Sequence, residues 1–216
     1  MSLQLIYCEQ GSREWAVARL AIPTASRFSD ILANGDGRTR RKYLLSLAGE
    51  MLTGEPMETF SNHHMERGRF LEVEARERYA FKYDVEPQPV GFIRNGRAGA
   101  SPDALLDGSG VLEIKTALPS ILIEKLLRDE FPPEHRAQTQ GELWIAEREW
   151  VDLAIYHPRL PLFVKRAARD EAYIRTLAAA VDRFNEELDL TVDMVRRCGD
   201  PDGFRKAPTA SLEAGA

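Results

Sequence analysis

The chain has 216 residues, with 29 lysines and arginines against 34 aspartates and glutamates, so its formal net charge is −5. This length suits one domain with a substantial core, and no apolar run is long enough to cross a membrane. The charge argues against a broad surface that coats DNA non-specifically. It does not exclude DNA as a substrate, because part of the acid can belong to a metal site.

Two cysteines, Cys8 and Cys198, stand at opposite ends of the chain without the spacing of a metal site. They exclude a cysteine-ligated iron–sulfur cluster and are typical of a reduced cytosolic protein. Residues 1–20 contain charged side chains and no small-residue cleavage site after an apolar run. We therefore expect no secretory signal and a cytoplasmic location.

Helical periodicity and capping residues predict several helices in chain order. Ser12 is expected to cap a short helix that runs to Leu20, and Thr24 or Ser26 a second one that runs to Leu32. The other predicted helices cover residues 41–52, 65–83, 121–128, 134–147 and 173–197.

Short apolar runs between turn formers predict the strands. These runs cover residues 90–93, 99–106, 111–117, 151–156 and 162–166. Together with the helices they predict an α/β architecture in one domain over residues 1–198, with helices around a central mixed sheet. Residues 199–216 are rich in Pro, Gly, Ala, Thr and Ser and lack apolar periodicity, so they are predicted to form a disordered tail.

The most informative segment runs from residue 100 to residue 116 and is predicted to form strand, turn and strand. Gly108, inside a run of turn formers, is the midpoint between Asp103 and Glu113, so a hairpin closed there places both carboxylates opposite each other. Glu113 and Lys115 are two residues apart and project from the same strand face. Two acids and one amine in a small volume are what a magnesium-dependent phosphodiesterase needs.

An exposed hairpin with an ordinary ladder of charges is the alternative interpretation, because an acid followed by Glu-x-Lys is a loose pattern. Three details favour catalysis. Glu113 and Lys115 stand inside an otherwise apolar strand, Pro102 forces an extended backbone before Asp103, and an apolar pair follows the acid at a short distance.

Ser101-Pro102-Asp103 with Glu113-Ile114-Lys115 resembles the core of the PD-(D/E)xK nucleases, specifically the lambda exonuclease or YqaJ-like viral recombinase family. Other motifs resemble the same family in the same order, and together they cover about residues 10–145. These motifs are Gln10 to Trp15 with Arg19 and Thr24-Ala25-Ser26, then Gly68 to Glu72, then Ala137 to Gln140 followed by Trp144.

The resemblance implies a restriction-endonuclease-like fold with a central mixed β-sheet flanked by helices. It implies a Mg²⁺-dependent 5′→3′ exonuclease on double-stranded DNA ends, which releases 5′ mononucleotides and leaves 3′ single-stranded DNA. The implied setting is phage-type recombination in the bacterial host cytoplasm. The implied partners are a single-strand annealing protein and further copies of the chain in a homotrimer ring.

The family implies a role for each residue of the core motif. Asp103 and Glu113 are expected to be direct ligands of one or two Mg²⁺ ions, for which Mn²⁺ can substitute, and the backbone carbonyl of Ile114 is expected to join them. Lys115 is expected to orient or deprotonate the attacking water and to offset charge on the phosphate.

Residues outside the core motif complete the implied site. Glu72 matches an additional acid near the metals, and Gln138 matches a glutamine that contacts the site. Asn95 stands where lambda exonuclease carries a further aspartate, and the spacing to the core motif is shorter, which leaves open whether a second metal site is complete.

Arg19 resembles the arginine that binds the 5′-phosphate in this family, and Ser26 and Ser101 are expected to add hydroxyl contacts. A planar guanidinium suits a terminal phosphate because it bonds in bidentate fashion. The alternative for Arg19 is a helix-end salt bridge.

Further DNA contacts are expected from a Gly-rich loop with cations, from an apolar wedge that separates the strands, and from the glutamine helix. The alternatives are a solvated helix start and ordinary core or surface positions. The residues are Arg38, Arg40, Arg41, Met65, Arg69 and Gln140. The four histidines lack metal-ligand spacing and are interpreted as non-catalytic.

Two rival functions stay open. One keeps the chemistry in a restriction-like or structure-specific endonuclease, which would cleave covalently closed circular DNA. The other is a catalytically silent DNA-binding subunit, against which the intact set of Asp103, Glu113 and Lys115 argues.

Overall fold

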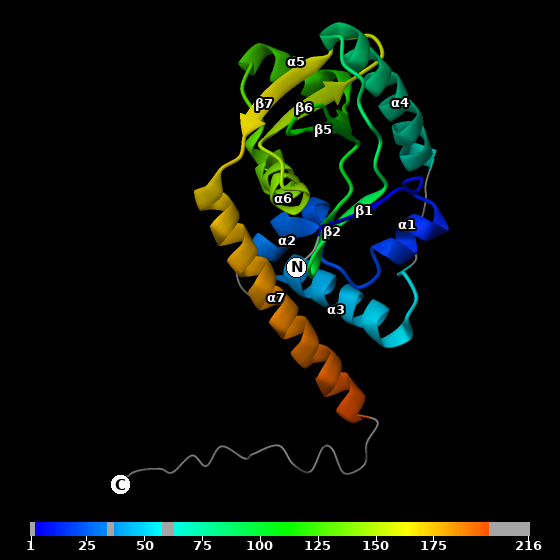
Figure 1. Ribbon diagram of the computed structural model, residues 1–216, viewed down its shortest axis with the longest axis vertical. Helices are drawn as coiled ribbons and strands as arrows, with labels where there is room; N and C mark the ends of the chain where they lie inside the picture. The colour runs from blue at the N-terminus through cyan, green and yellow to red at the C-terminus, as the bar shows by residue number, and fades with distance from the viewer. Residues whose placement is uncertain (1–2, 34–36, 58–62, 199–216) are drawn as a thin grey trace.

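The computed structural model of the chain describes residues 3–33, 37–57 and 63–198, with the backbone alone at 63–69. Helices surround two small β-sheets, and a long C-terminal helix runs along the body and extends beyond it (Figure 1). The predicted α/β architecture is confirmed, although the strands form two sheets instead of one. The tail predicted at 199–216 lies outside the described residues.

Capping explains where the N-terminal helices begin and end. The Ser12 hydroxyl accepts a hydrogen bond from the Trp15 backbone N–H at 3.1 Å, as predicted, whereas Thr24 makes no capping bond. Gly54 ends a later helix with φ of 72°, a value that favours glycine. The elements are α1 (Arg13–Ala18), η1 (Ala25–Arg27), α2 (Phe28–Leu32), α3 (Arg38–Thr53) and α4 (His63–Tyr83).

The first sheet is antiparallel and has the order β1-β2-β3. Its strands are β1 (Leu3–Ile6), β2 (Phe92–Asn95) and β3 (Ala98–Ala100). The sequence patterns did not predict β1, which lies at the edge of the sheet and exposes most of its side chains.

The second sheet is mixed and has the order β4-β5-β6-β7. Its strands are β4 (Ala104–Leu106), β5 (Gly110–Thr116), β6 (Trp150–Tyr156) and β7 (Phe163–Ala168). The central pair β5 and β6 is parallel, and both outer pairings are antiparallel. In the parallel register Glu113 pairs with Leu153, and Leu112 pairs with Asp152.

The single strand predicted at residues 99–106 is wrong, because the chain leaves one sheet and enters the other at Ser101–Asp103. Ala100 pairs with β2, whereas Ala104 pairs with β5. Pro102 has no backbone N–H to donate to a neighbouring strand, which favours a break in strand pairing at Ser101–Asp103. The break puts Asp103 between the two sheets.

Different helices cover the two faces of the second sheet. Side chains of α4, including Ala75 and Tyr79, pack with Leu112 and Ile114 of β5. On the opposite face Leu122 packs against β6 and β7, and α6 packs near β5. The helices of this half are α5 (Pro119–Arg128), η2 (Pro133–His135), α6 (Arg136–Ala146) and α7 (Glu171–Cys198).

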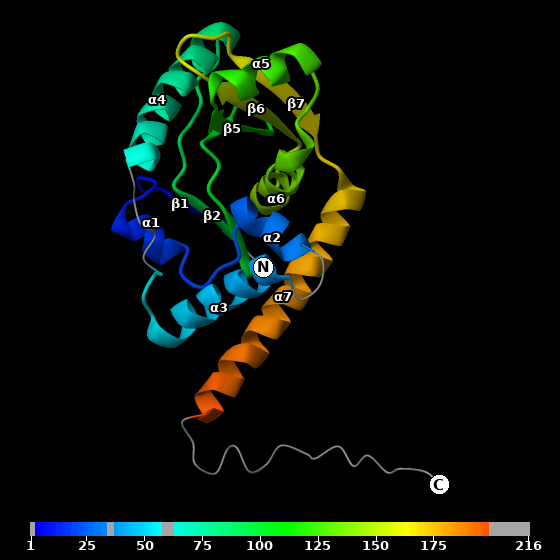
Figure 2. The same cartoon turned by 180° about the vertical axis from the view of Figure 1, so that it is seen from behind.

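Helix α6 lies close to the N-terminal segment because of Gly141. A Cβ added at this position would lie 2.5 Å from the Phe28 ring and 3.2 Å from the Ala25 Cβ, so only glycine permits the approach. Helix α7 then packs along α2, α3 and α6 (Figure 2). None of the helices in the described ranges is both long and apolar enough to span a bilayer.

Candidate active site

Asp103 and Glu113 meet across the predicted hairpin. Ala104 of β4 pairs with Leu112 of β5, and the same register carried one step further places Asp103 opposite Glu113. Asp103 is only 8% exposed, and one of its carboxylate oxygens accepts a hydrogen bond from the Ile114 backbone N–H at 2.5 Å. The bond holds the acid against β5, beside the residue whose carbonyl is the predicted third ligand.

The electrostatic environment disfavours a bare charge on Asp103. Burial raises the pKa of this carboxyl well above its ordinary value, and the charges of Glu113 and Glu72 raise it further. A divalent cation would relieve both effects, because it would offset the crowded negative charge.

Glu113 and Lys115 project from the same face of β5, as predicted, and form an ion pair in which Lys115 Nζ lies 2.6 Å from Glu113 Oε1. Burial lowers the pKa of Lys115, but the Glu113 charge and hydrogen bond more than offset this, so the pKa is raised overall. The charged ammonium favours a role in orienting water or stabilising charge over a role as a base.

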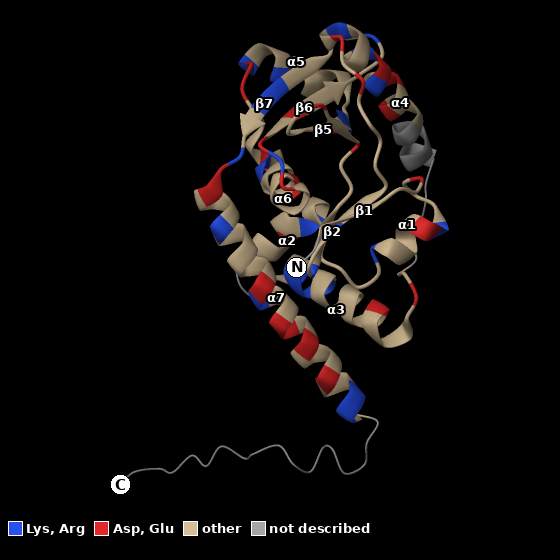
Figure 3. Ribbon diagram, in the orientation of Figure 1, with Lys and Arg blue, Asp and Glu red and all other residues tan. Residues whose placement is uncertain are grey.

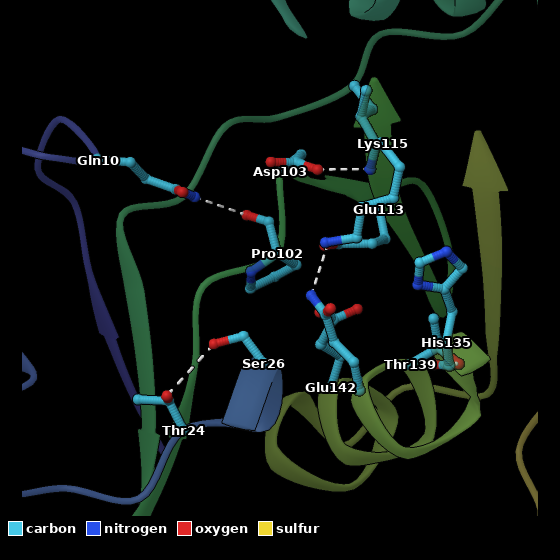
Figure 4. Close-up of polar contacts among 12 residues, drawn as sticks. Gln10, Thr24, Ser26, Pro102, Asp103, Glu113, Lys115, His135, Thr139 and Glu142 are labelled. Atoms are coloured by element: carbon cyan, nitrogen blue, oxygen red, sulfur yellow. Dashed lines mark hydrogen bonds and ion pairs between the residues drawn. The ribbon is translucent and has the colours of Figure 1, made fainter. Parts of the chain in front are cut away.

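Helix α6 contributes Gln138, as predicted, and also Glu142. Gln138 Nε2 donates hydrogen bonds to Glu113 Oε1 at 2.5 Å and to Glu142 Oε1 at 2.8 Å. Glu142 extends from α6 toward Glu113 (Figure 4). Burial raises the pKa of Glu142 well above its ordinary value, and the Glu113 charge raises it further.

Glu142 was not predicted from the sequence, although a signal was present. Gln138 and Glu142 are four residues apart and therefore share one face of a helix. Their neighbours are apolar enough to indicate an ordinary core helix. Only the docking of α6 on β5 shows that this acid reaches the site.

Glu72 of α4 belongs to the same cluster, as predicted from the family motif. The pKa of Glu72 is raised, chiefly because the side chain is buried, and the charge of Glu113 raises it further. The charges of Arg76 and Lys115 and a hydrogen bond with Asp103 lower it in part. Its carboxylate lies 3.1 Å from Arg76 Nη2. The arrangement brings a fourth acid, on a different helix, to the Asp103 side of the cluster.

The cluster suits a hard divalent cation by donor type and by charge. Asp103, Glu113 and Glu142 are buried carboxylates with Lys115 as the nearest cation. One oxygen of Glu113, Oε2, is buried and has no hydrogen-bond partner in the described part of the chain. Within the described residues, no group of three or more acidic, histidine or cysteine side chains is arranged to hold a metal ion by itself.

A second polar cluster is built around Arg19. Its guanidinium carbon lies 3.8 Å from the centroid of the Trp15 ring, and Nη2 is 3.4 Å from the Thr24 hydroxyl. The Thr24 and Ser26 hydroxyl oxygens are 3.4 Å apart (Figure 4). The predicted contact residues Arg19 and Ser26 are therefore brought together, with Thr24 between them.

Trp15 and Gln10 connect this second cluster to the catalytic segment. The Trp15 indole N–H donates to the Ser101 hydroxyl at 2.9 Å and to the Gly91 carbonyl at 3.1 Å. Gln10 Nε2 donates to the Pro102 carbonyl at 3.0 Å. Ser101, the third predicted contact, thus stands two residues before Asp103 and is fixed by the same N-terminal segment.

The guanidinium of Arg19 suits an anion. Burial lowers the pKa of Arg19, and within the described ranges no carboxylate forms an ion pair with it. The helix-end salt bridge that was the alternative interpretation is therefore not formed there. A partly desolvated guanidinium without an acid is well suited to a phosphate.

The predicted DNA contacts of the Gly-rich loop stand in the first turn of α3. Arg38 and Arg41 are exposed, whereas Arg40 forms an ion pair with Glu187 of α7 at 2.7 Å. Acidic side chains line the C-terminal half of α7 (Figure 3), and the DNA contacts expected of Arg38, Arg40 and Arg41 stay a prediction. Residues 34–36 and the side chains of Met65 and Arg69 lie outside the described residues.

One expectation is corrected. Gln140 is buried; its amide donates to the Ala168 carbonyl at 2.9 Å and accepts from the Asp170 backbone N–H at 2.8 Å, so it joins β7 to α7 instead of contacting DNA. Asn95, the departure that left a second metal site open, donates to the Ile145 carbonyl at the far end of α6. The acid that α6 adds to the site is Glu142.

The match to a protein-family model covers residues 14–149 and is described as a YqaJ-like viral recombinase domain. The chain belongs to this family. The matched segment contains both polar clusters, from Trp15 to Glu142. A comparison with curated proteins finds no match.

Solved structures agree with this assignment. LHK-Exo in complex with dAMP is 33% identical with a TM-score of 0.80, and the alignment covers 86% of this chain and 97% of that one. The alkaline exonuclease LHK-Exo from Laribacter hongkongensis gives 31% identity and a TM-score of 0.78 over the same shares.

A phage-related exonuclease from Haemophilus somnus 129PT shares the fold, with a TM-score of 0.62 and 12% identity over 81% of this chain and 96% of that one. YqaJ-like membership and the acidic cluster together support a DNA nuclease with the PD-(D/E)xK fold.

Proposed function

We propose that the chain is a Mg²⁺-dependent 5′→3′ exonuclease that begins at double-stranded DNA ends, releases 5′ mononucleotides and leaves a 3′ single strand. The observation that supports this most is that the Arg19 cluster and the acidic cluster meet on one segment, Ser101–Asp103. Two extended residues span roughly 7 Å at most. A terminal phosphate bound at Ser101 would therefore lie beside Asp103, and cleavage there would remove a single nucleotide.

Each residue has a defined task in this proposal. Asp103, Glu113 and the Ile114 carbonyl would hold the ion, which would supply a water of lowered pKa and offset charge on the scissile phosphate. The Lys115 ammonium would stabilise the charge that develops in the transition state. Gln138 would hold Glu113 in place through the hydrogen bond at 2.5 Å.

The anion cluster would supply the specificity for ends. The Arg19 guanidinium, fixed by the Trp15 ring, would bind the terminal phosphate together with the Ser26 and Ser101 hydroxyls. A phosphate inside a strand carries a further nucleotide on its 5′ side and does not present the same charge or shape. This difference would align the first phosphodiester bond of an end with the acidic cluster.

The relatives support this reaction. LHK-Exo was crystallised with dAMP, a nucleoside monophosphate of the kind that the proposed reaction releases. The family description supports a role in recombination, with handover of the 3′ strand to an annealing protein in the host cytoplasm. A homotrimer ring around DNA would allow processive digestion by a chain of net charge −5, because enclosure replaces electrostatic attraction.

The test uses linear duplexes with a 5′-phosphate or a 5′-hydroxyl, each labelled on one strand, with Mg²⁺ or with a chelator. We expect mononucleotides to be released from the 5′ end of the labelled strand. Their release should be faster from phosphorylated ends than from hydroxyl ends, and no release is expected with the chelator. Covalently closed circular DNA is the matched control. Cleavage of the circle would establish the endonuclease instead, and absence of cleavage on every substrate would leave the silent DNA-binding subunit.

A further inference from the structure

Glu142 lies at the acidic centre but has no task in the reaction described above. It is 1% exposed, and its Oε2 has no hydrogen-bond partner in the part of the chain that the structure describes. Burying a carboxylate without an ion pair or a full set of hydrogen bonds is costly, and an apolar side chain would fill the same space at lower cost. Glu142 lies close to Glu113, whose charge raises its pKa, and it accepts a hydrogen bond from Gln138 at 2.8 Å; this bond points to its role.

The Gln138 carboxamide is fixed by two acceptors. Its nitrogen carries two hydrogens, and the bonds to Glu113 at 2.5 Å and Glu142 at 2.8 Å use both of them. With both acids ionised, a flipped carboxamide would place its oxygen against two carboxylates, so the orientation with the nitrogen toward both acids is assigned from these contacts. Because Gln138 and Glu142 are one turn apart on α6, the helix maintains this geometry without help from a loop.

The same geometry makes the two oxygens of Glu113 unequal. Oε1 accepts from Gln138 at 2.5 Å and pairs with Lys115 at 2.6 Å. Oε2 is buried and lacks a partner among the residues described. One oxygen is thus anchored by protein groups, and the other is left for an outside ligand.

We propose that Glu142 is a positioning residue that acts through Gln138: it anchors one oxygen of Glu113 so that the other is presented to the divalent cation. The inference rests on the proposed role of Glu113 as a metal ligand. Without an acceptor at position 142, one hydrogen of Gln138 loses its partner and the carboxamide can rotate away from Glu113. Loss of such a supporting contact weakens metal affinity by roughly 10- to 100-fold.

The experiment measures Mn²⁺ binding to the full-length, DNA-free protein by electron paramagnetic resonance of the free ion, so it does not depend on nuclease activity. Glu142→Gln keeps an acceptor oxygen, whereas Glu142→Met keeps the length without one. We expect Glu142→Met to bind Mn²⁺ at least roughly tenfold more weakly, and Glu142→Gln to stay within about threefold of wild type. Glu142→Met should also melt at or above the wild-type temperature, because a buried carboxylate is removed.

Three further variants distinguish a lost contact from a folding defect. Gln138→Leu should lose affinity as Glu142→Met does, and the double variant should lose no more than either, because both act through one contact. Gln140→Leu is the matched control on the same helix: it should lower the melting temperature and leave Mn²⁺ affinity unchanged. If Glu142→Met does not fold, the inference is supported when Gln138→Leu binds Mn²⁺ weakly and Glu142→Gln binds it as wild type does.

Unchanged Mn²⁺ affinity in Glu142→Met or in Gln138→Leu would overturn the inference and leave the proposed function intact. Equal loss in Glu142→Gln and Glu142→Met would also overturn it, since the carboxylate charge would then act directly on the ion. Absence of Mn²⁺ binding by the wild-type protein would overturn the metal role of Glu113, and with it both proposals.

Discussion

Glu113 and Asp152 are acids on adjacent parallel strands, and the exposed fraction of each side chain is 4%. They differ in face and in hydrogen bonding. Asp152 lies on the face covered by α4, where it accepts from the Tyr79 hydroxyl at 2.6 Å and from Arg166 at 2.8 Å on each oxygen. Glu113 lies on the other face and keeps one oxygen without a partner in the described residues.

The difference shows that burial alone does not identify a catalytic acid. Asp152 is satisfied by groups of the protein, so its network joins α4, β6 and β7 and stabilises the fold. The acids around Glu113 are crowded, and Oε2 of Glu113 and Oε2 of Glu142 have no hydrogen-bond partner among the described residues, which is the environment that the proposed cation would complete. Substitutions at Asp152 should therefore affect mainly stability, and substitutions around Glu113 mainly activity.

The largest effect is expected from Asp103→Ala, with Glu113→Ala as its partner. Each should abolish Mg²⁺-dependent cleavage of linear duplex while the protein stays folded, because each removes a ligand of the ion. Product release and circular dichroism on the same purified samples would measure both properties. Appreciable Mg²⁺-dependent activity in either variant would contradict the proposal that the substituted acid is a metal ligand.

Lys115→Ala should slow cleavage by roughly 10²- to 10³-fold, about 2.7–4 kcal/mol, through lost stabilisation of the transition state. Single-turnover rates at saturating enzyme would separate this effect from DNA binding. A rate within about tenfold of wild type would mean that the lysine acts mainly as the structural partner of Glu113.

Arg19→Ala should remove the preference for phosphorylated ends while hydroxyl ends are degraded at nearly the wild-type rate. A lost charge-assisted contact of this kind is worth roughly 1.5–3 kcal/mol, a factor on the order of ten to a hundred in the preference. Initial rates on the four combinations of enzyme and end type give the ratio directly. An unchanged ratio would show that the terminal phosphate is bound elsewhere.

Asp152→Ala should lower the free energy of unfolding by about 1–3 kcal/mol, because the buried Tyr79 hydroxyl loses its acceptor. The Arg166 side chain is 57% exposed and remains solvated, so it adds little to this cost. Urea unfolding would measure the loss, and the cleavage rate per folded molecule should not change. A variant of wild-type stability with impaired cleavage would reverse the roles assigned to the two acids.

The smallest effect concerns pH. The folded-state pKa values of Asp103 and Glu142 are raised, so folding favours their protonated forms, and these two carboxyls should add stability to the metal-free protein as the pH falls toward the unfolded carboxyl value, roughly 4. His135, whose pKa burial lowers, acts in the opposite direction below its unfolded value, roughly 6.5. Acids with lowered pKa, such as Asp170 and Asp189, act in the opposite direction only near their unfolded values, roughly pH 4. Melting temperatures across this range, with and without Mg²⁺, test the point: the gain should shrink with metal bound, and Glu142→Gln should reduce it.

The sequence predicted the parts of the site that follow from local geometry. The midpoint at Gly108 and the two-residue period of a strand were enough to bring Asp103, Glu113 and Lys115 together. Arg19 and Ser26 were found by resemblance, because a guanidinium and a hydroxyl near helix ends have no periodic signal of their own. The structure brings Arg19 and Ser26 together at Thr24, and their role in binding a phosphate stays a prediction.

What the sequence did not predict depends on contacts between distant segments. The pattern of residues 99–106 is continuous, and nothing local shows that Ala100 and Ala104 belong to different sheets. Gln138 and Gln140 look alike along the chain, yet one bonds to Glu113 and the other to the backbone before α7. Glu142 was missed for the same reason, since only the face that α6 turns toward β5 reveals it.

The glycine at position 141 sets the distance between the two clusters. It lets α6, which carries Gln138, rest on the Phe28 ring just after Ser26, where a single added carbon would lie 2.5 Å from that ring. The spacing between the Arg19 cluster and the acidic cluster therefore depends on close packing in the core and not on loop length. If the proposed function holds, this packing would determine how far from the bound 5′-phosphate the chain is cut, and so the length of each released product.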